Sequence, residues 1–151
     1  MSHKIRVAMD LHGTLDTYPE LRELFNYAIE KGHEVFIMSG SIKTTLVKEL
    51  RKFKDLNPKY ELISVMDYAR SLGIKGADEG YIDDDLYWAL KSVLCKKYNI
   101  QALIDNEPKF GQFMQNDFVY DGRCNHRTHF ILIDPNDDIK HVVESFKENY
   151  L

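Results

Sequence analysis

Short apolar runs alternate with amphipathic stretches along most of this chain, and several runs end at an aspartate or a serine. The clearest runs, with the polar residue that follows each, are 5–9 with Asp10, 34–38 with Ser39, and 101–104 with Asp105. Such a switching of strand-like and helix-like periodicity is typical of parallel α/β sheets. The chain has 151 residues, which suits one domain of this kind. We therefore predict a single α/β domain over residues 1–151, with a three-layer, Rossmann-like parallel sheet of about five strands.

The expected elements leave polar residues at one edge of this sheet. The expected strands are 5–9, 34–38, 61–65, 101–104 and 128–133, and the expected helices are 19–31, one capped by Ser41, one through Tyr68 and Leu72, 83–98, and 137–150. Ligands of parallel sheets bind beyond the carboxyl ends of the strands. The candidates at these ends are Asp10, Ser39, Asp67, Asp105 and Asp134. Each of them alone is more often structural, because turns must be solvated, so the combination carries the argument.

Composition excludes several classes of function. The net charge of −4 creates no overall field that would attract nucleic acid in bulk. No apolar run approaches the roughly 18 to 20 residues of a membrane-spanning helix. The first apolar stretch ends at Asp10, so we expect no signal segment and a location in the cytoplasm. Cys95 and Cys124 are expected to stay reduced there.

Three stretches resemble motifs of the haloacid dehalogenase superfamily. Residues 7–16, VAMDLHGTLD, are similar to its first motif, an apolar strand followed by Asp-x-Asp-Gly-Thr-Leu. Residues 36–40, FIMSG, resemble its second motif, and residues 103–107, LIDNE, resemble its fourth. The resemblance runs from residue 5 to about residue 113, and in particular to short phosphatase-like members, some of them phage-encoded, that carry Asp-x-His. It implies a fold of that superfamily without a large cap domain.

The resemblance implies a magnesium-dependent phosphomonoester hydrolase with Asp10 as the nucleophile. A carboxylate can take a phosphoryl group and release it to water as an acyl phosphate. A divalent cation is needed because the carboxylate and the phosphate repel each other. Mg²⁺ prefers one or two carboxylates with water. The implied ligands are Asp10, Asp105 and the main-chain carbonyl of His12, with Asn106 or Glu107 acting through water or beside them.

The remaining motif residues are expected to bind the phosphoryl group. Ser39 offers a hydroxyl donor, and the backbone amides near Leu11, His12 and Gly40 can surround the other oxygens. Gly13 allows a sharp turn behind the nucleophile, and we expect Gly13 and Thr14 to lie against the substrate.

A lysine completes the site in the family, and two lysines compete for this place. Lys91 lies 14 residues before Asp105 on the expected helix 83–98, so its side chain would have to reach back toward the sheet. Lys75 lies in a glycine-rich loop after the third strand. We expect Lys91 to be the catalytic lysine and Lys75 to be the alternative, with a role in substrate binding.

His12 is the main departure from the family pattern, because most phosphatases of the family have an aspartate there. An imidazole with an ordinary pKa near 6.5 exchanges protons around neutrality, so we predict that His12 is the general acid and base. One alternative is a catalytically silent protein that binds a metal, a phosphate ligand or a partner protein. Another keeps catalysis but cleaves a carbon–halogen or phosphonate bond. Asp16 falls one residue before the family's usual acid and receives no role.

The site is expected to be uncovered and therefore open to bulky substrates. Only residues 15–18 separate Thr14 from the expected helix at Pro19, which leaves no room for a large lid. A nucleotide, a nucleic-acid end or a phosphoprotein could therefore reach the site. Residues 109–127, with Phe110, Phe113, Phe118 and Tyr120, are expected to shape one wall. Cys124, His126 and His129 suit zinc, but a closed zinc site needs a fourth ligand.

Overall fold

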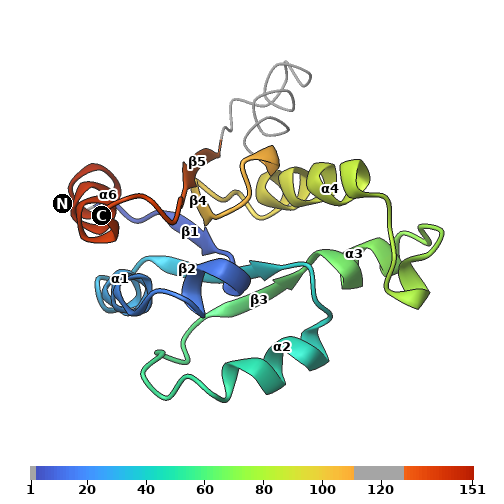
Figure 1. Ribbon diagram of the computed structural model, residues 1–151, viewed down its shortest axis with the longest axis horizontal. Helices are drawn as coiled ribbons and strands as arrows, with labels where there is room; N and C mark the ends of the chain where they lie inside the picture. Colours follow the sequence, from blue (N-terminus) through green and yellow to red (C-terminus); the bar gives the residue numbers. More distant parts are fainter. Residues whose placement is uncertain (1–2, 111–127) are drawn as a thin grey trace.

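The computed structural model, which describes residues 3–110 and 128–151, has a five-stranded parallel sheet at its centre (Figure 1). The strands are β1 (Arg6–Met9), β2 (Glu34–Ser39), β3 (Glu61–Ser64), β4 (Ala102–Asp105) and β5 (His129–Leu132). Their order is β3-β2-β1-β4-β5. The chain thus steps from β1 outward to β3, and then returns to the other side of β1 for β4. Ligands of such sheets bind at this reversal, beyond the carboxyl ends of the strands.

Helices cover both faces of the sheet, as predicted. The elements are η1 (Leu11–Leu15), α1 (Pro19–Glu30), α2 (Lys43–Leu50), α3 (Val65–Ser71), η2 (Ala77–Glu79), α4 (Asp84–Lys97) and α6 (Ile139–Tyr150). One hydrophobic cluster joins one sheet face to α1, α2 and α6, and a second joins the opposite face to α3 and α4. Within the described ranges, no segment forms a separate domain over the strand ends, and no helix is long and apolar enough to cross a membrane.

The central strands are apolar on both faces because both faces are covered. Val7, Ala8 and Met9 of β1 are fully buried, and every residue of β4 is buried as well. A strand buried on both sides shows a continuous apolar run instead of the alternation of a half-exposed strand. This is why the short runs in the sequence mark the strands to within one or two residues.

One predicted helix start is wrong. Helix α2 begins at Lys43 with Ile42 as its N-cap residue, and Ser41 makes no side-chain cap. The carbonyl of Ser41 instead accepts a hydrogen bond from the Ser64 hydroxyl, at 2.7 Å. The Lys43 amide donates to Asp67 Oδ2, at 3.1 Å, so α3 supplies the cap for α2. Asp67 is therefore a structural residue of this corner, a role that local sequence does not reveal.

Candidate active site

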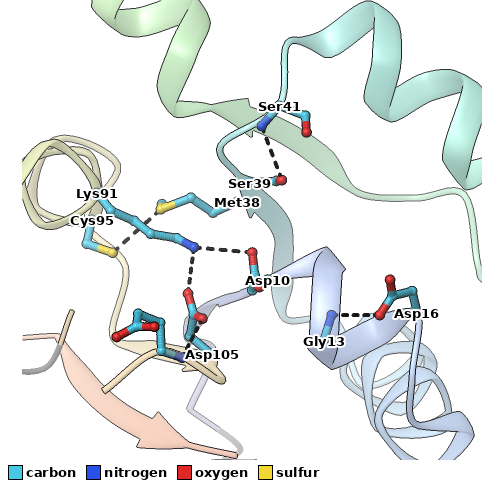
Figure 2. Close-up of polar contacts among 10 residues, drawn as sticks. Asp10, Gly13, Asp16, Met38, Ser39, Ser41, Lys91, Cys95 and Asp105 are labelled. Atoms are coloured by element: carbon cyan, nitrogen blue, oxygen red, sulfur yellow. Dashed lines mark hydrogen bonds and ion pairs between the residues drawn. The ribbon is translucent and has the colours of Figure 1, made fainter. Parts of the chain in front are cut away.

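Two carboxylates and one ammonium group meet at the point where the sheet order reverses. Asp10 follows β1 and Asp105 ends β4, and the pairing of Met9 with Ile104 sets these carboxylates side by side. Lys91 enters from α4: its Nζ lies 2.5 Å from Asp105 Oδ2 and 3.3 Å from Asp10 Oδ1. Figure 2 shows the Lys91 side chain extending from the helix to both aspartates. The structure thus brings together three residues that are far apart in the sequence.

Lys91 reaches the carboxylates because its whole side chain is packed inside the protein. The residue is 0% exposed, and its Nζ lies 4.3 Å from the centre of the Phe110 ring. Phe110 in turn packs against Tyr87, one helical turn before Lys91 on α4, with ring centres 5.7 Å apart. This aromatic pair keeps water away from the ammonium group. It also directs the ammonium group toward the strand ends.

Burial disfavours the ionised form of Asp10 in this site. Burial raises the pKa of Asp10 from 3.8 to about 6; the Lys91 ammonium opposes that shift, and the Asp105 carboxylate adds to it. For Lys91 burial lowers the pKa, but the carboxylates of Asp10 and Asp105 outweigh burial, so its pKa lies above the usual range. Lys91 therefore stays charged. With both aspartates ionised, the three groups carry one net negative charge, which favours a further cation.

The chain turns sharply directly after Asp10. His12 and Gly13 have φ/ψ of −74°/124° and 76°/5°, the values of a type II turn, which needs glycine at its second central position. The Gly13 amide donates to Asp16 Oδ1, at 2.8 Å (Figure 2). A Cβ at Gly13 would stand 2.2 Å from Asn106 Nδ2. Asp16, to which the sequence assigned no role, therefore holds the turn behind the nucleophile.

His12 lies at the mouth of the site and is held by a second acidic residue. Its Nε2 lies 2.5 Å from Oε2 of Glu49, in the last turn of α2. The two side chains are 48% and 33% exposed, so this pair is in contact with solvent. With Nε2 occupied by the carboxylate, Nδ1 is the ring nitrogen left to exchange protons with a bound molecule.

Ser39 and Gly40 form another side of the site. Ser39 ends β2 and is buried, and its Oγ accepts a long hydrogen bond from the Ser41 amide, at 3.4 Å. Its hydroxyl proton can therefore be donated to a ligand oxygen. A Cβ at Gly40 would lie 2.5 Å from the Tyr87 Oη, so glycine lets this phenol lie directly against the loop. Burial raises the pKa of Tyr87, which keeps it a neutral donor.

A cavity of about 610 Å³ opens above these residues. The predicted site residues that line it are Asp10, His12, Ser39, Gly40, Lys91, Asp105, Asn106, Glu107 and Phe110. The structure does not bring Gly13, Thr14 or Lys75 to its wall. The Gly13 amide is used by Asp16, Thr14 is fully buried, and Lys75 is exposed in the turn after α3. Of the two competing lysines, only Lys91 lies at the aspartates.

Several wall residues were not predicted from the sequence. They include Met66 and Arg70 from α3 and Tyr87 and Trp88 from α4. Tyr87 and Trp88 lie four and three residues before Lys91, so helical spacing places all three on one face. That signal was available in the sequence. Arg70 and the histidine partner Glu49 carry no such signal, because both depend on how their helices pack on the sheet.

The donor set fits magnesium better than a closed transition-metal site. Among the described residues, no group of three or more His, Cys, Asp and Glu side chains is arranged to hold a metal. Mg²⁺ usually needs only one or two carboxylates and takes water for the rest. Asp10 and Asp105 already face one cationic nitrogen from two neighbouring strands, so both carboxylates are placed to share a cation.

Some predictions fall outside the described residues. Cys124 and His126 of the zinc alternative do so, and so does the expected wall beyond Phe110, with Phe113, Phe118 and Tyr120. His129 is described, and its Nδ1 lies 3.1 Å from the Tyr150 hydroxyl. Asp134 Oδ1 accepts from the Asn136 amide and shapes a turn away from the cavity.

Comparison with known proteins adds little to this geometry. No family model and no curated protein matches the chain. Among solved structures, the chain is similar to the core domain of a protein described as a phosphoglycolate phosphatase from Streptococcus pneumoniae TIGR4, at 20% identity and a TM-score of 0.48, over 95% of this chain and 98% of that one. A UDP-galactose 4-epimerase matches at 11% identity and a TM-score of 0.30, over 68% of this chain and 38% of that one.

Proposed function

We propose that this chain is a magnesium-dependent hydrolase of phosphomonoesters that acts through an aspartyl-phosphate on Asp10. The observation that carries the proposal is the meeting of Asp10, Asp105 and the buried Lys91 at one end of a substrate-sized cavity. The motifs that resemble the haloacid dehalogenase superfamily lie at the same strand ends. The motifs and this geometry both support Asp10 as the nucleophile.

In the first step, an oxygen of Asp10 attacks phosphorus and the ester oxygen leaves. Lys91 keeps its positive charge beside Asp10 and lowers the repulsion between this carboxylate and the dianionic phosphate. Ser39 donates its hydroxyl proton to a phosphoryl oxygen. When bound between Asp10 and Asp105, Mg²⁺ would neutralise charge on the transferred oxygens.

His12 handles the protons of both steps in this proposal. Its imidazole donates a proton to the leaving oxygen, and in the second step it accepts one from the water that attacks the aspartyl-phosphate. Glu49 holds Nε2, so the ring presents Nδ1 to the substrate. The second step releases inorganic phosphate and returns Asp10 and His12 to their starting states.

Phosphate release from 4-nitrophenyl phosphate tests the proposal, with Mg²⁺ and with a chelator. We expect turnover only with Mg²⁺, and Asp10→Asn should lower it by about a thousandfold or more. The matched control is Asp78→Asn, because Asp78 is exposed and does not line the cavity. Equal release by Asp10→Asn, or release without metal at the same rate, would reject the mechanism. No release from any phosphomonoester would favour the silent binding protein instead.

A further inference from the structure

The cavity is much larger than a phosphoryl group requires. Its volume of about 610 Å³ is in the range of pockets that hold whole organic ligands, about 300–1,000 Å³. From the aspartates it extends to a wall made by α3 and α4, where Met66 and Trp88 offer apolar surface. Figure 1 shows α3 and α4 beyond the carboxyl ends of the strands, on the same side of the molecule. This wall is the part of the cavity that is open to the rest of a ligand whose phosphoryl group lies at the aspartates.

Arg70 is a fixed cation in that wall. Its Nε donates to the Ala77 carbonyl at 2.8 Å, and its Nη2 lies 3.3 Å from the Asp78 carbonyl. These two bonds hold the guanidinium in place. Within residues 3–110 and 128–151, Nη1 makes no hydrogen bond and no carboxylate forms an ion pair with Arg70. Lys91, the other permanent cation of the lining, is already shared by two aspartates. Arg70 therefore has positive charge available for a ligand.

Arg70 and Asp10 lie beyond the ends of two strands that are not neighbours in the sheet. Asp10 follows β1, and Arg70 belongs to the helix that follows β3, two strands away. Neighbouring strands lie about 4.8 Å apart, so β1 and β3 are separated by roughly 10 Å. The bonds to the Ala77 and Asp78 carbonyls hold the guanidinium at η2, away from the pair of aspartates that Lys91 contacts.

We propose that the substrate is a phosphomonoester whose leaving group carries a second anionic group, which pairs with Arg70. A ring or similar apolar portion would lie between the two charges, against Met66 and Trp88. The second anion is a carboxylate or a phosphate, because both accept hydrogen bonds from a guanidinium. This inference rests on the proposed function, since the ester phosphate is assigned to Asp10.

The test compares matched aryl phosphates that differ in one group. The probes are 4-(2-carboxyethyl)phenyl phosphate, its methyl ester, in which the second group is uncharged, and the analogue with a phosphonate in place of the carboxylate. The ratio of kcat/KM between a charged probe and the ester isolates the second anion. A hydrogen-bonded charge pair predicts a ratio of about ten- to a hundredfold in the wild-type protein. The larger of the two ratios identifies carboxylate or phosphate as the preferred group.

Arg70→Met should bring both ratios close to one, and Arg70→Lys should keep part of the preference. The control is Arg51→Met, an exposed arginine outside the cavity, which should keep the wild-type ratios. If Arg70 only holds the turn at Ala77 and Asp78, its replacement will lower kcat/KM for all probes equally. That result, or a wild-type ratio near one, overturns the inference.

A binding measurement separates this inference from the proposed function. Calorimetry in the presence of a chelator gives the Kd of each probe without turnover, for wild type and for Arg70→Met. An Arg70-dependent preference for the charged probes, with no turnover under any condition, would reject the hydrolase and retain the anion site. Turnover that depends on Asp10 but shows no charge preference would do the opposite.

Discussion

Replacing the nucleophile should stabilise the metal-free protein. Asp10 is only 7% exposed, and burial raises its pKa from 3.8 to about 6, against the opposing charge of Lys91. The ionised carboxylate is therefore less stable in the folded protein than in the unfolded chain. Two pKa units correspond to about 3 kcal/mol at neutral pH. Because asparagine does not ionise, we expect Asp10→Asn to raise the free energy of unfolding at pH 7 by up to about 3 kcal/mol, or about 6–12 °C in Tm.

The pH dependence of this gain has a definite sign. The carboxyl of Asp10 loses its proton near pH 3.8 in the unfolded chain and near pH 6 in the folded protein. Between these values the folded state binds more protons, so the stability of the wild type falls as the pH rises through this range. At pH 4 the variant should therefore have almost no advantage. The full advantage should be present above pH 6.

Urea unfolding with a chelator at pH 4, 5 and 7 measures this difference. Asp78→Asn is again the control, because Asp78 is exposed and should show no such pH-dependent gain. Adding Mg²⁺ should then stabilise the wild type more than Asp10→Asn, since the ion binds only the folded site. Lower stability of Asp10→Asn than of the wild type at pH 7 without metal would contradict the destabilising charge at Asp10, and so would an equally large gain at pH 4.

Three further changes test other parts of the site. Lys91→Met leaves two buried carboxylates without their cation. It should lower the free energy of unfolding, measured in urea at pH 7, by about 3–5 kcal/mol. A loss below about 1 kcal/mol would contradict the buried pairing. Glu49→Gln should lower kcat by about tenfold, because the ring of His12 loses the charge that orients it; an unchanged kcat removes Glu49 from the mechanism. Gly13→Ala and Gly73→Ala should each lower the free energy of unfolding by about 1–2 kcal/mol in thermal unfolding, since both glycines have positive φ. Only Gly13→Ala displaces Asn106, so only this variant should reduce turnover.

Much of the fold could be predicted because buried parallel strands leave a direct trace in the sequence. The runs before Asp10 and Asp105 are apolar on both faces, and both strands were placed to within one residue. The helix caps were harder to predict. Ser41 has the right residue type for a cap, but Asp67 supplies it from the next helix. A cap that comes from another element depends on packing, which local residue preference does not describe.

The sequence by itself determined which chemical groups stand at the ends of the strands, because residue type and apolar periodicity are local properties. It also required glycine at position 13, where the turn behind Asp10 needs a positive φ. The choice of Lys91 over Lys75, the pairing of His12 with Glu49 and the position of Arg70 were decided only by the tertiary structure. These long side chains extend from helices, so the groups they reach depend on how α2, α3 and α4 pack on the sheet. Distances between elements follow from that packing, and no local pattern in the chain records them.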